Sequence, residues 1–308
     1  MLYVIRYLWP QGARYVFNCY KHWSLVLYYD STAGTAATLY SATGVVQGFP
    51  LSMFTYALTL VPLIRRLQRE FPTLLHIWYA DDGNAAGRFP ELKLFLDRLT
   101  RLGAPYGYLV QPNKSQLITC HPDHARTYFC PTRTGLQNIT VGGRFLGGYI
   151  GTHATFLPWL TAQVNTWARS LYSMTIPARF FPQSTYIGTQ KSLQQEWQFI
   201  QRTCSCPPEC FKPLELLLTR HLIPSLFDLS ADHPSMPPRQ LTSLPIKKAG
   251  LALPDPRTTA HTNYQASRVI SFEIIRALID PTLAAPPTSP IDPTATIPPG
   301  PFRIADHR

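Results

Sequence analysis

The stretch HIWYADDGN, residues 76–84, decides the fold of the first half of this chain. An apolar run ends at two adjacent aspartates, a glycine follows, and a second short run starts at Ala85. This order predicts a β-hairpin with a tight turn that presents Asp81 and Asp82 at its tip. Adjacent carboxylates repel each other unless a cation lies between them, and Mg²⁺ typically takes one or two carboxylates together with substrate phosphates. The stretch indicates metal-assisted phosphoryl transfer, with a common Asp-Gly surface turn as the alternative.

A second motif, GVVQGFPLS at residues 44–52, precedes this hairpin and leads into a long apolar segment. We expect a buried helix over Leu51–Leu67, bent at Pro62. A tight glycine turn at the start of a helix leaves backbone N–H groups free to meet phosphate. Gln47 and Gly48 are therefore candidate ligand-binding residues, and a helix N-cap turn without a ligand is the alternative.

Together the two motifs resemble a known family. Gln-Gly-x-Pro-Leu-Ser, a helix, and then Tyr-Ala-Asp-Asp at a hairpin tip are similar to the palm of reverse transcriptases, and most similar to the polymerases of non-LTR (LINE-type) retrotransposons. The resemblance covers residues 10–278, more densely up to residue 151. It implies an RNA-directed DNA polymerase, a nucleotidyltransferase that uses Mg²⁺, with Mn²⁺ as an alternative. The implied partners are an RNA template, a DNA primer and dNTPs, with no obligate protein partner.

The resemblance also implies roles for single residues. Asp81 and Asp82 match the metal-binding pair, and Asp81 is the expected direct ligand. Lys114 matches a basic residue that stabilises or protonates the departing pyrophosphate, and a solvated lysine is the alternative. The residues that match the nucleotide- and template-binding motif are Gln47, Gly48, Pro50 and Tyr79. The residues that look like the primer-grip strand, where a tight sheet corner is the alternative, are Phe145, Leu146, Gly147 and Gly148.

The chain departs from the family pattern at two points. Phe49 stands where the family has a small polar residue, which changes the polarity of the pocket. The family also needs a third carboxylate on an earlier strand, and that aspartate lies further upstream of Gln47 than this chain extends. Asp30 is too close to Gln47 and lies in a different predicted hairpin. We therefore expect a truncated polymerase that is inactive alone. The alternatives to a truncated polymerase are a non-catalytic nucleic-acid-binding remnant and a decayed retroelement reading frame.

The patterns predict an α+β fold in three parts. Residues 1–151 are expected to form a partial palm, a small antiparallel sheet with packed helices, and residues 152–280 a helical thumb-like bundle. Residues 281–308 are proline-rich and are predicted to be a disordered tail. The expected helices span residues 10–22, 51–67, 90–103, 159–174, 184–202, 213–222 and 258–278. The expected strands span residues 24–29, 38–43, 116–120 and 144–150, besides the hairpin at 76–84.

Composition narrows the class of partner and the compartment. The 308-residue chain carries a formal net charge of +11, which favours nucleic acid, with charge for solubility as the alternative. It has no run of 18 apolar residues and no secretory cleavage pattern, so we expect an intracellular protein of the nucleus or cytoplasm without a membrane partner. Six cysteines in a chain of this length indicate reduced thiols. Cys204, Cys206 and Cys210 have irregular spacing, so we predict no structural zinc.

Overall fold

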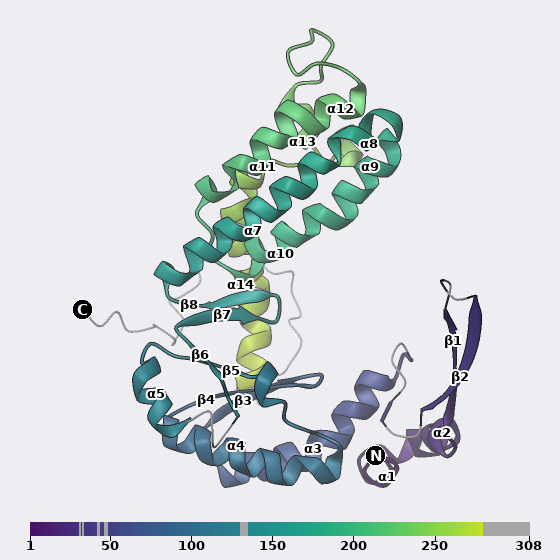
Figure 1. Cartoon of the computed structure of the whole chain (residues 1–308), viewed down its shortest axis with the longest axis vertical. Helices are drawn as coiled ribbons and strands as arrows, with labels where there is room; N and C mark the ends of the chain where they lie inside the picture. Colours follow the sequence, from purple (N-terminus) through teal and green to yellow (C-terminus); the bar gives the residue numbers. More distant parts are fainter. Residues whose placement is uncertain (31, 33, 42–43, 46–48, 130–134, 280–308) are drawn as a thin grey trace. The chain divides into compact units, whose positions relative to one another are not determined.

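The computed structural model describes residues 1–30, 32, 34–41, 44–45, 49–129 and 135–279, and the predicted tail at 281–308 lies outside this range. The fold is α+β (Figure 1). It divides into two compact units, Met1–Thr140 and the residues from Val141 onward. This division falls before the boundary expected at residue 151. The described strands form four separate two-stranded sheets, where a single small sheet was expected. Within the described part, no helix combines the length and the apolar character that a membrane span needs.

The first unit contains most of the elements expected from the sequence. Its helices are α1 (Leu2–Leu8), α2 (Pro10–Tyr20), α3 (Ser52–Glu70), α4 (Phe89–Gly103) and α5 (Pro122–Tyr128), with 3₁₀ turns η1 (Ala104–Tyr106) and η2 (Pro112–Lys114). Its strands are β1 (Ser24–Asp30), β2 (Thr35–Ser41), β3 (Leu75–Tyr79), β4 (Asp82–Ala86), β5 (Gln116–Ile118) and β6 (Asn138–Thr140). The pairs β1–β2 and β3–β4 are antiparallel, whereas β5 and β6 pair in parallel.

Helices α3 and α4 form the core of this unit. Leu60, Leu63 and Leu67 repeat at helical spacing on α3 and are at most 2% exposed. They form one cluster with Leu74, Phe95 and Leu99. Because the apolar face of each helix is buried against the other, the β3–β4 hairpin that connects them is held at both ends.

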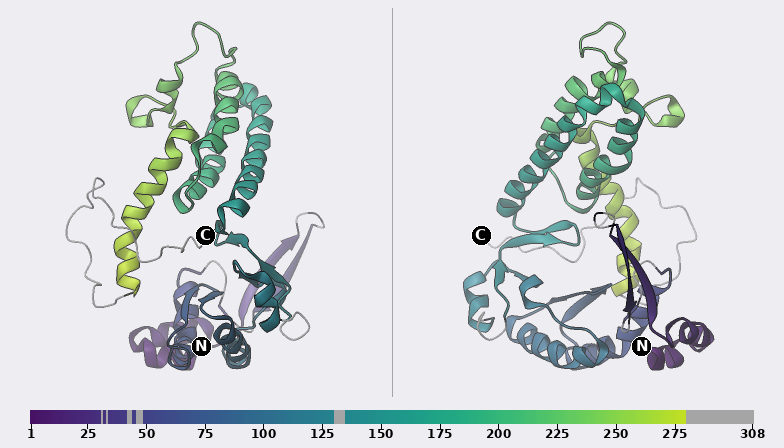
Figure 2. Two further views of the ribbon diagram at one scale, coloured as in Figure 1. Left: turned by 90° about the vertical axis from the view of Figure 1, so that its left-hand side faces the viewer. Right: turned by 45° about the vertical axis from the view of Figure 1, so that its right-hand side comes forward.

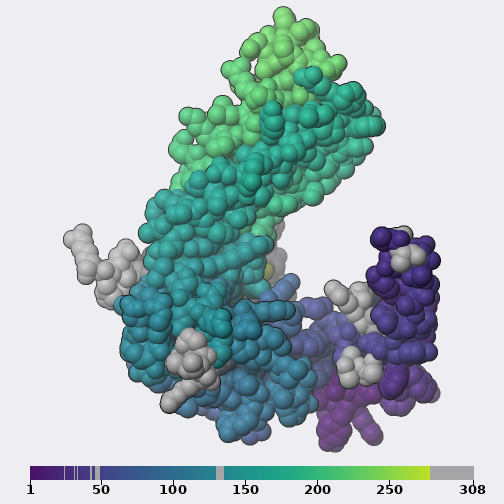
Figure 3. All heavy atoms as spheres, viewed as in Figure 1, coloured from purple at the N-terminus to yellow at the C-terminus, as the bar shows by residue number. Residues whose placement is uncertain are grey.

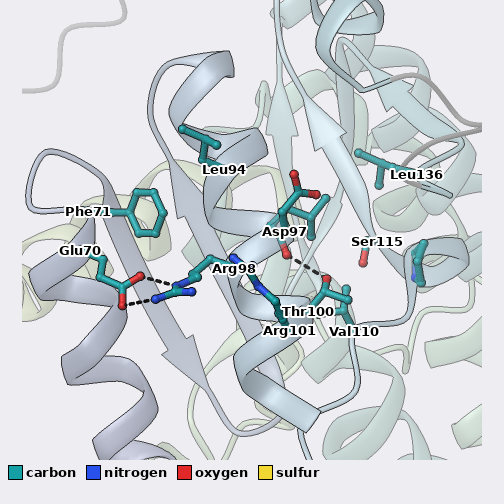
Figure 4. A pocket seen from close by; sticks show the side chains of 12 residues that line it. Glu70, Phe71, Leu94, Asp97, Arg98, Thr100, Arg101, Val110, Ser115 and Leu136 are labelled. Atoms are coloured by element: carbon teal, nitrogen blue, oxygen red, sulfur yellow. Dashed lines mark hydrogen bonds and ion pairs between the residues drawn. The ribbon is translucent and has the colours of Figure 1, made fainter.

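An ion pair also joins α3 to α4. Arg98 donates two hydrogen bonds to the Glu70 carboxylate, at 2.5 and 2.9 Å (Figure 4). These bonds, and a further one from Arg66, lower the pKa of Glu70 to about 2. The pair borders a hollow of about 800 Å³, whose lining includes Phe71, Arg101 and Leu136. Since the pair is partly exposed, its contribution to stability is modest, and burial of the leucines dominates.

The β1–β2 hairpin is apolar but exposed. Leu27, Tyr29 and Tyr40 are 76%, 66% and 62% exposed, and Figure 3 shows the atoms of this hairpin, in purple, open to solvent on the face in view. A two-stranded hairpin alone is marginally stable in water. The hairpin therefore presents apolar surface that the described residues leave uncovered.

The second unit begins with a hairpin and continues as helices. Its strands are β7 (Gly142–Phe145) and β8 (Gly148–Gly151), which pair antiparallel. Its helices are α7 (His153–Ser173), α8 (Thr175–Phe180), α9 (Pro182–Gly188), α10 (Gln194–Thr203), α11 (Lys212–Leu217), α12 (Ile223–Phe227), α13 (Arg239–Ser243) and α14 (Pro256–Ile279). Shorter 3₁₀ or π segments are η3 (Thr189–Leu193), η4 (Pro208–Phe211), η5 (Leu218–Leu222) and η6 (Ile246–Lys248).

Two expectations for this unit are corrected. The single strand expected over residues 144–150 is wrong, because the chain reverses at Leu146 and Gly147, whose φ angles are +45° and +83°. Two successive positive φ values make a tight hairpin turn, which glycine favours. The continuous helix expected over 184–202 is interrupted by the π-helical segment η3 between α9 and α10. The spacing of apolar residues in the sequence does not distinguish the hydrogen-bond pattern of a π-helix from that of an α-helix.

The helical core is built on α7, α10 and α11. Leu160, Val164, Trp167 and Leu171 follow the helical period along α7 and are at most 4% exposed. They cluster with Trp197 of α10 and with other buried residues of the unit. Their periodicity explains why this region was recognisable as a bundle from sequence.

A buried glutamine joins α10 to the long helix α14, drawn in yellow-green in Figure 2. The Gln201 amide nitrogen donates to the Pro256 carbonyl oxygen at 2.7 Å. Its oxygen accepts hydrogen bonds from Thr259 Oγ1 at 3.0 Å and from Asn263 Nδ2 at 2.9 Å. Gln201 is fully buried, so satisfaction of both ends of its amide is what makes its burial tolerable.

We expect Arg239→Ala to destabilise the second unit by about 3–5 kcal/mol. Arg239 forms two 2.8 Å hydrogen bonds with the Glu215 carboxylate and also donates to the Leu253 carbonyl oxygen. The Glu215 side chain is 10% exposed, so loss of the arginine leaves a buried charge unpaired. Urea unfolding monitored by circular dichroism measures the change. Arg220→Ala is the control because Arg220 pairs with Asp232, whose side chain is 89% exposed, and it should cost at most about 1 kcal/mol.

We expect the first unit to lose stability as the pH falls below about 6.5, the unfolded-state pKa of histidine. His76 Nδ1 accepts a 2.8 Å hydrogen bond from Trp78 Nε1, while its Nε2 has no partner among the described residues. Burial lowers the pKa of His76, so the folded state binds fewer protons than the unfolded state in this range. Urea unfolding at pH 7.5 and 5.5 tests this. His76→Asn, which retains an acceptor, should reduce the pH dependence, and the exposed-site variant His121→Asn should not.

Candidate active site

The carboxylate pair lies at the tip of the β3–β4 hairpin. Tyr79 pairs with Asp82, so Ala80 and Asp81 form a two-residue loop. Ala80 has a φ of +54°, the left-handed conformation that such a loop uses. The turn therefore lies two positions before the Asp82-Gly83 step from which it was expected, and Asp82 is the first residue of β4. Both aspartates are exposed, so their oxygens are accessible to a ligand from solvent.

Gly83 serves packing, although the sequence suggested a turn glycine. It pairs across the hairpin with Trp78, whose ring lies over it. A Cβ atom at Gly83 would lie 2.7 Å from Trp78 Cζ3 and 2.9 Å from Tyr108 Oη. Both distances are shorter than van der Waals contact. Trp78 and Tyr108 therefore occupy the space that a side chain at residue 83 would need. The glycine next to Asp82 thus brings the rings close to the acidic turn.

Two tyrosines that sequence reasoning missed lie near the acidic pair. Burial raises the pKa of Tyr56 on α3, and the charge of Asp81 raises it further. Burial also raises the pKa of Tyr108, and the charges of Asp82 and Asp81 add to this effect, while a backbone hydrogen bond with Gly83 acts in the opposite direction. A signal was available for Tyr108, since it follows Gly107 just after the predicted end of α4. No pattern in the sequence marks Tyr56 apart from other apolar positions of its helix.

The donor set at the tip fits a hard divalent cation that takes its remaining ligands from outside the protein. Asp81 and Asp82 offer charged oxygens, which suit Mg²⁺ or Mn²⁺ together with water and substrate phosphates. Across the part of the chain that the structure describes, no group of three His, Cys, Asp or Glu side chains comes together. The pair alone therefore provides part of the set that a two-metal centre needs.

The structure describes only two of the four residues predicted for the nucleotide site. Gln47 and Gly48 lie outside the described residues. Pro50 is exposed just before α3, and Tyr79 is 64% exposed at the end of β3. Phe49 packs edge-on against Tyr20, with 6.1 Å between the ring centroids. This contact gives the unexpected phenylalanine a packing role at the entry to α3.

Lys114 is exposed at the end of η2, two positions before the first residue of β5. Its backbone N–H donates to the Gln111 carbonyl oxygen at 3.0 Å, which fixes the turn. Within the described residues its ammonium group is not in salt-bridge contact with Asp81 or Asp82. Lys114 is thus available to an external anion.

The four residues expected in the primer-grip strand form the end of the β7–β8 hairpin in the second unit. Phe145 pairs with Gly148, and Leu146 and Gly147 make the turn. A Cβ atom at Gly147 would lie 3.0 Å from Phe199 Cε1, so this turn packs closely on a ring of α10. Leu146 is 46% exposed at the tip. The structure shows a tight hairpin end at these residues, and the neighbour that approaches Gly147 is the side chain of Phe199. The primer-grip role stays a prediction.

The three clustered cysteines are core residues. Cys204 and Cys206 are buried, and Cys210 is partly buried. Burial raises the pKa of the Cys206 thiol, and the neighbouring thiols of Cys204 and Cys210 raise it further. Their surroundings favour a packing role.

We expect Gly83→Ala to destabilise the first unit by about 1–3 kcal/mol, the usual cost of overpacking. The added methyl group would overlap the Trp78 ring and the Tyr108 hydroxyl. Gly87→Ala is the matched control at the other end of β4, because there the nearest atom, Leu74 Cγ, is 3.4 Å away. Urea unfolding of both variants is the measurement. Equal stability of the two would contradict the packing assigned to Gly83.

Comparison with known proteins identifies no relative. No family model matches the chain, no curated protein matches it, and no solved structure matches it.

Proposed function

We propose that this chain is a palm-and-thumb portion of a reverse transcriptase of the non-LTR retrotransposon type, an RNA-directed DNA polymerase. The observation that carries the proposal is the exposed pair Asp81 and Asp82 at the hairpin tip, where Asp81 lies in the two-residue loop after Tyr79 and Asp82 begins β4. The QGFPLS motif, which begins at Gln47 and leads into α3, supports it. The net charge of +11 is suited to template and primer as partners.

The reaction joins the primer 3′-oxygen to the α-phosphorus of a dNTP and breaks the bond to pyrophosphate. A divalent cation bound at the tip would supply charge compensation for the phosphates. Asp81 and Asp82 would hold such a cation at the end of the β3–β4 hairpin. Catalysis of phosphoryl transfer consists largely of positioning and charge compensation. Lys114, exposed and cationic, would donate a proton to the departing pyrophosphate or stabilise its charge.

A second candidate function is nucleic-acid binding without chemistry. It is favoured by the incomplete donor set, since the described residues bring only two carboxylates to the tip and polymerases need a further one from another strand.

The exposed β1–β2 hairpin is the observation that would fit a decayed reading frame, because uncovered apolar surface promotes aggregation. The candidates differ in whether Asp81 matters once a complete palm is restored.

We expect no primer extension by the 308-residue chain, and Mg²⁺-dependent extension on an RNA template after fusion to the upstream palm and fingers of a non-LTR reverse transcriptase. In that chimera Asp81→Asn should abolish extension, because the amide keeps the shape and loses the charge that holds the cation. Lys114→Ala should slow it by about 10²–10⁴-fold, as for one proton donor. Asp123→Asn is the control, since the Asp123 side chain is 93% exposed on α5.

Full activity of the Asp81→Asn chimera would refute the metal assignment. An inactive chimera that still binds an RNA–DNA duplex, with affinity falling steeply as salt rises, would support the second candidate. Extension by the 308-residue chain alone would show that two carboxylates at the tip suffice.

A further inference from the structure

We propose that Tyr108 is the positioning residue of the acidic pair, holding the tip of the β3–β4 hairpin through contacts with Gly83 and Trp78. The importance of this role for catalysis rests on the proposed function, whereas the contacts themselves are independent of it. Tyr108 comes from the segment after α4, more than twenty positions beyond the hairpin. It therefore supplies a tertiary restraint that the hairpin cannot supply by itself.

The end of α4 aims Tyr108 at the hairpin. The Gly107 N–H donates to the Ala104 carbonyl oxygen at 2.9 Å, and the Tyr108 N–H donates to the Gly103 carbonyl oxygen at 3.0 Å. Gly107 has a φ of +75°. These two hydrogen bonds and the left-handed glycine constitute a Schellman motif, which reverses the chain at a helix end. A Cβ at Gly103 would lie 2.5 Å from the Tyr108 carbonyl oxygen, so this reversal depends on glycine at both positions.

The Tyr108 ring packs on the hairpin next to the acidic turn. Its centroid lies 5.3 Å from that of Trp78, with an interplanar angle of 70°. Trp78 is fixed in turn by its hydrogen bond to His76 at 2.8 Å. Edge-to-face aromatic pairs contribute more stabilising free energy than the burial of their area alone, so this contact orients both rings.

The hydroxyl group of Tyr108 acts on the backbone of β4. In an antiparallel pair, hydrogen-bonded and non-hydrogen-bonded positions alternate, and a two-residue loop is closed by a hydrogen-bonded pair. Tyr79 and Asp82 are that pair, so the N–H of Gly83 points outward from the hairpin, where the ladder cannot satisfy it. The Tyr108 hydroxyl lies against this backbone, because a Cβ atom at Gly83 would be only 2.9 Å from its oxygen. We infer that this oxygen accepts a hydrogen bond from the Gly83 N–H.

The consequence concerns the geometry of the carboxylates. Asp82 is bonded directly to Gly83, and Asp81 lies in the two-residue loop before it. An isolated hairpin frays at its exposed end, and Ala80 is held in a left-handed conformation that a non-glycine residue adopts at a cost. Clamping Gly83 from outside the hairpin restricts the motion of both carboxylates, and a preorganised ligand pair binds a cation more tightly.

The test uses the full chain with Tyr108→Phe, which removes the hydroxyl group and retains the ring, and Tyr106→Phe from the same turn as the control. Amide hydrogen exchange at Gly83 is measured by NMR, and Mn²⁺ affinity by electron paramagnetic resonance. Tyr108→Phe should accelerate Gly83 exchange about fivefold, the factor for loss of one net hydrogen bond, and weaken Mn²⁺ binding by a similar factor with little change in Tm. Tyr106→Phe should change neither.

Two outcomes separate this inference from the proposed function. Unchanged Gly83 exchange in Tyr108→Phe, with Mn²⁺ binding that still requires Asp81, would overturn the role of Tyr108 and leave the metal site intact. Mn²⁺ binding that is unaffected by Asp81→Asn would overturn the metal site, while faster Gly83 exchange in Tyr108→Phe would still support the clamp.

Discussion

The packing of the Trp78 ring over the bare backbone of Gly83 is the constraint on which the candidate site depends. Because Gly83 has no side chain, Trp78 and Tyr108 both reach the strand that carries Asp82. Trp78 in turn requires an acceptor for its indole N–H, which His76 supplies from the same face of β3. An apolar face thus supports a tip that carries the two carboxylates. This division lets two like charges sit side by side in solvent without disturbing the core.

The second unit uses a different principle, in which buried polar groups attach an irregular segment to helices. The chain between η6 and α14 has little regular structure, so its carbonyl groups need partners elsewhere. Tyr186 donates to the Leu251 carbonyl oxygen, Gln194 to that of Ala252, and Arg239 to that of Leu253. Gln201 continues the series at Pro256. Four side chains from the three helices α9, α10 and α13 therefore hold this irregular segment in place.

The proposed chemistry involves only a small part of the molecule. The acidic tip concerns one hairpin of the first unit, whose supports lie on α3, α4 and the turn that follows α4. The exposed apolar β1–β2 hairpin and the exposed Ile270 and Ile274 of α14 have no role in that chemistry. They are surfaces on which further polypeptide or nucleic acid would gain the most burial of apolar area.

Local patterns in the sequence determined the α+β class, the helices at the core of each unit and the acidic hairpin, because hydrophobic period and turn residues act over a few positions. They did not determine the position of the turn at Ala80–Asp81, the reversal at Leu146–Gly147, or the π segments, because these depend on which of several allowed hydrogen-bond patterns the neighbouring rings and helices accept. The purpose of Gly83 and the approach of Tyr56 and Tyr108 were decided only by tertiary structure. Contacts between residues distant in sequence carry no local signature, since they arise from packing of surfaces that each appear ordinary in isolation.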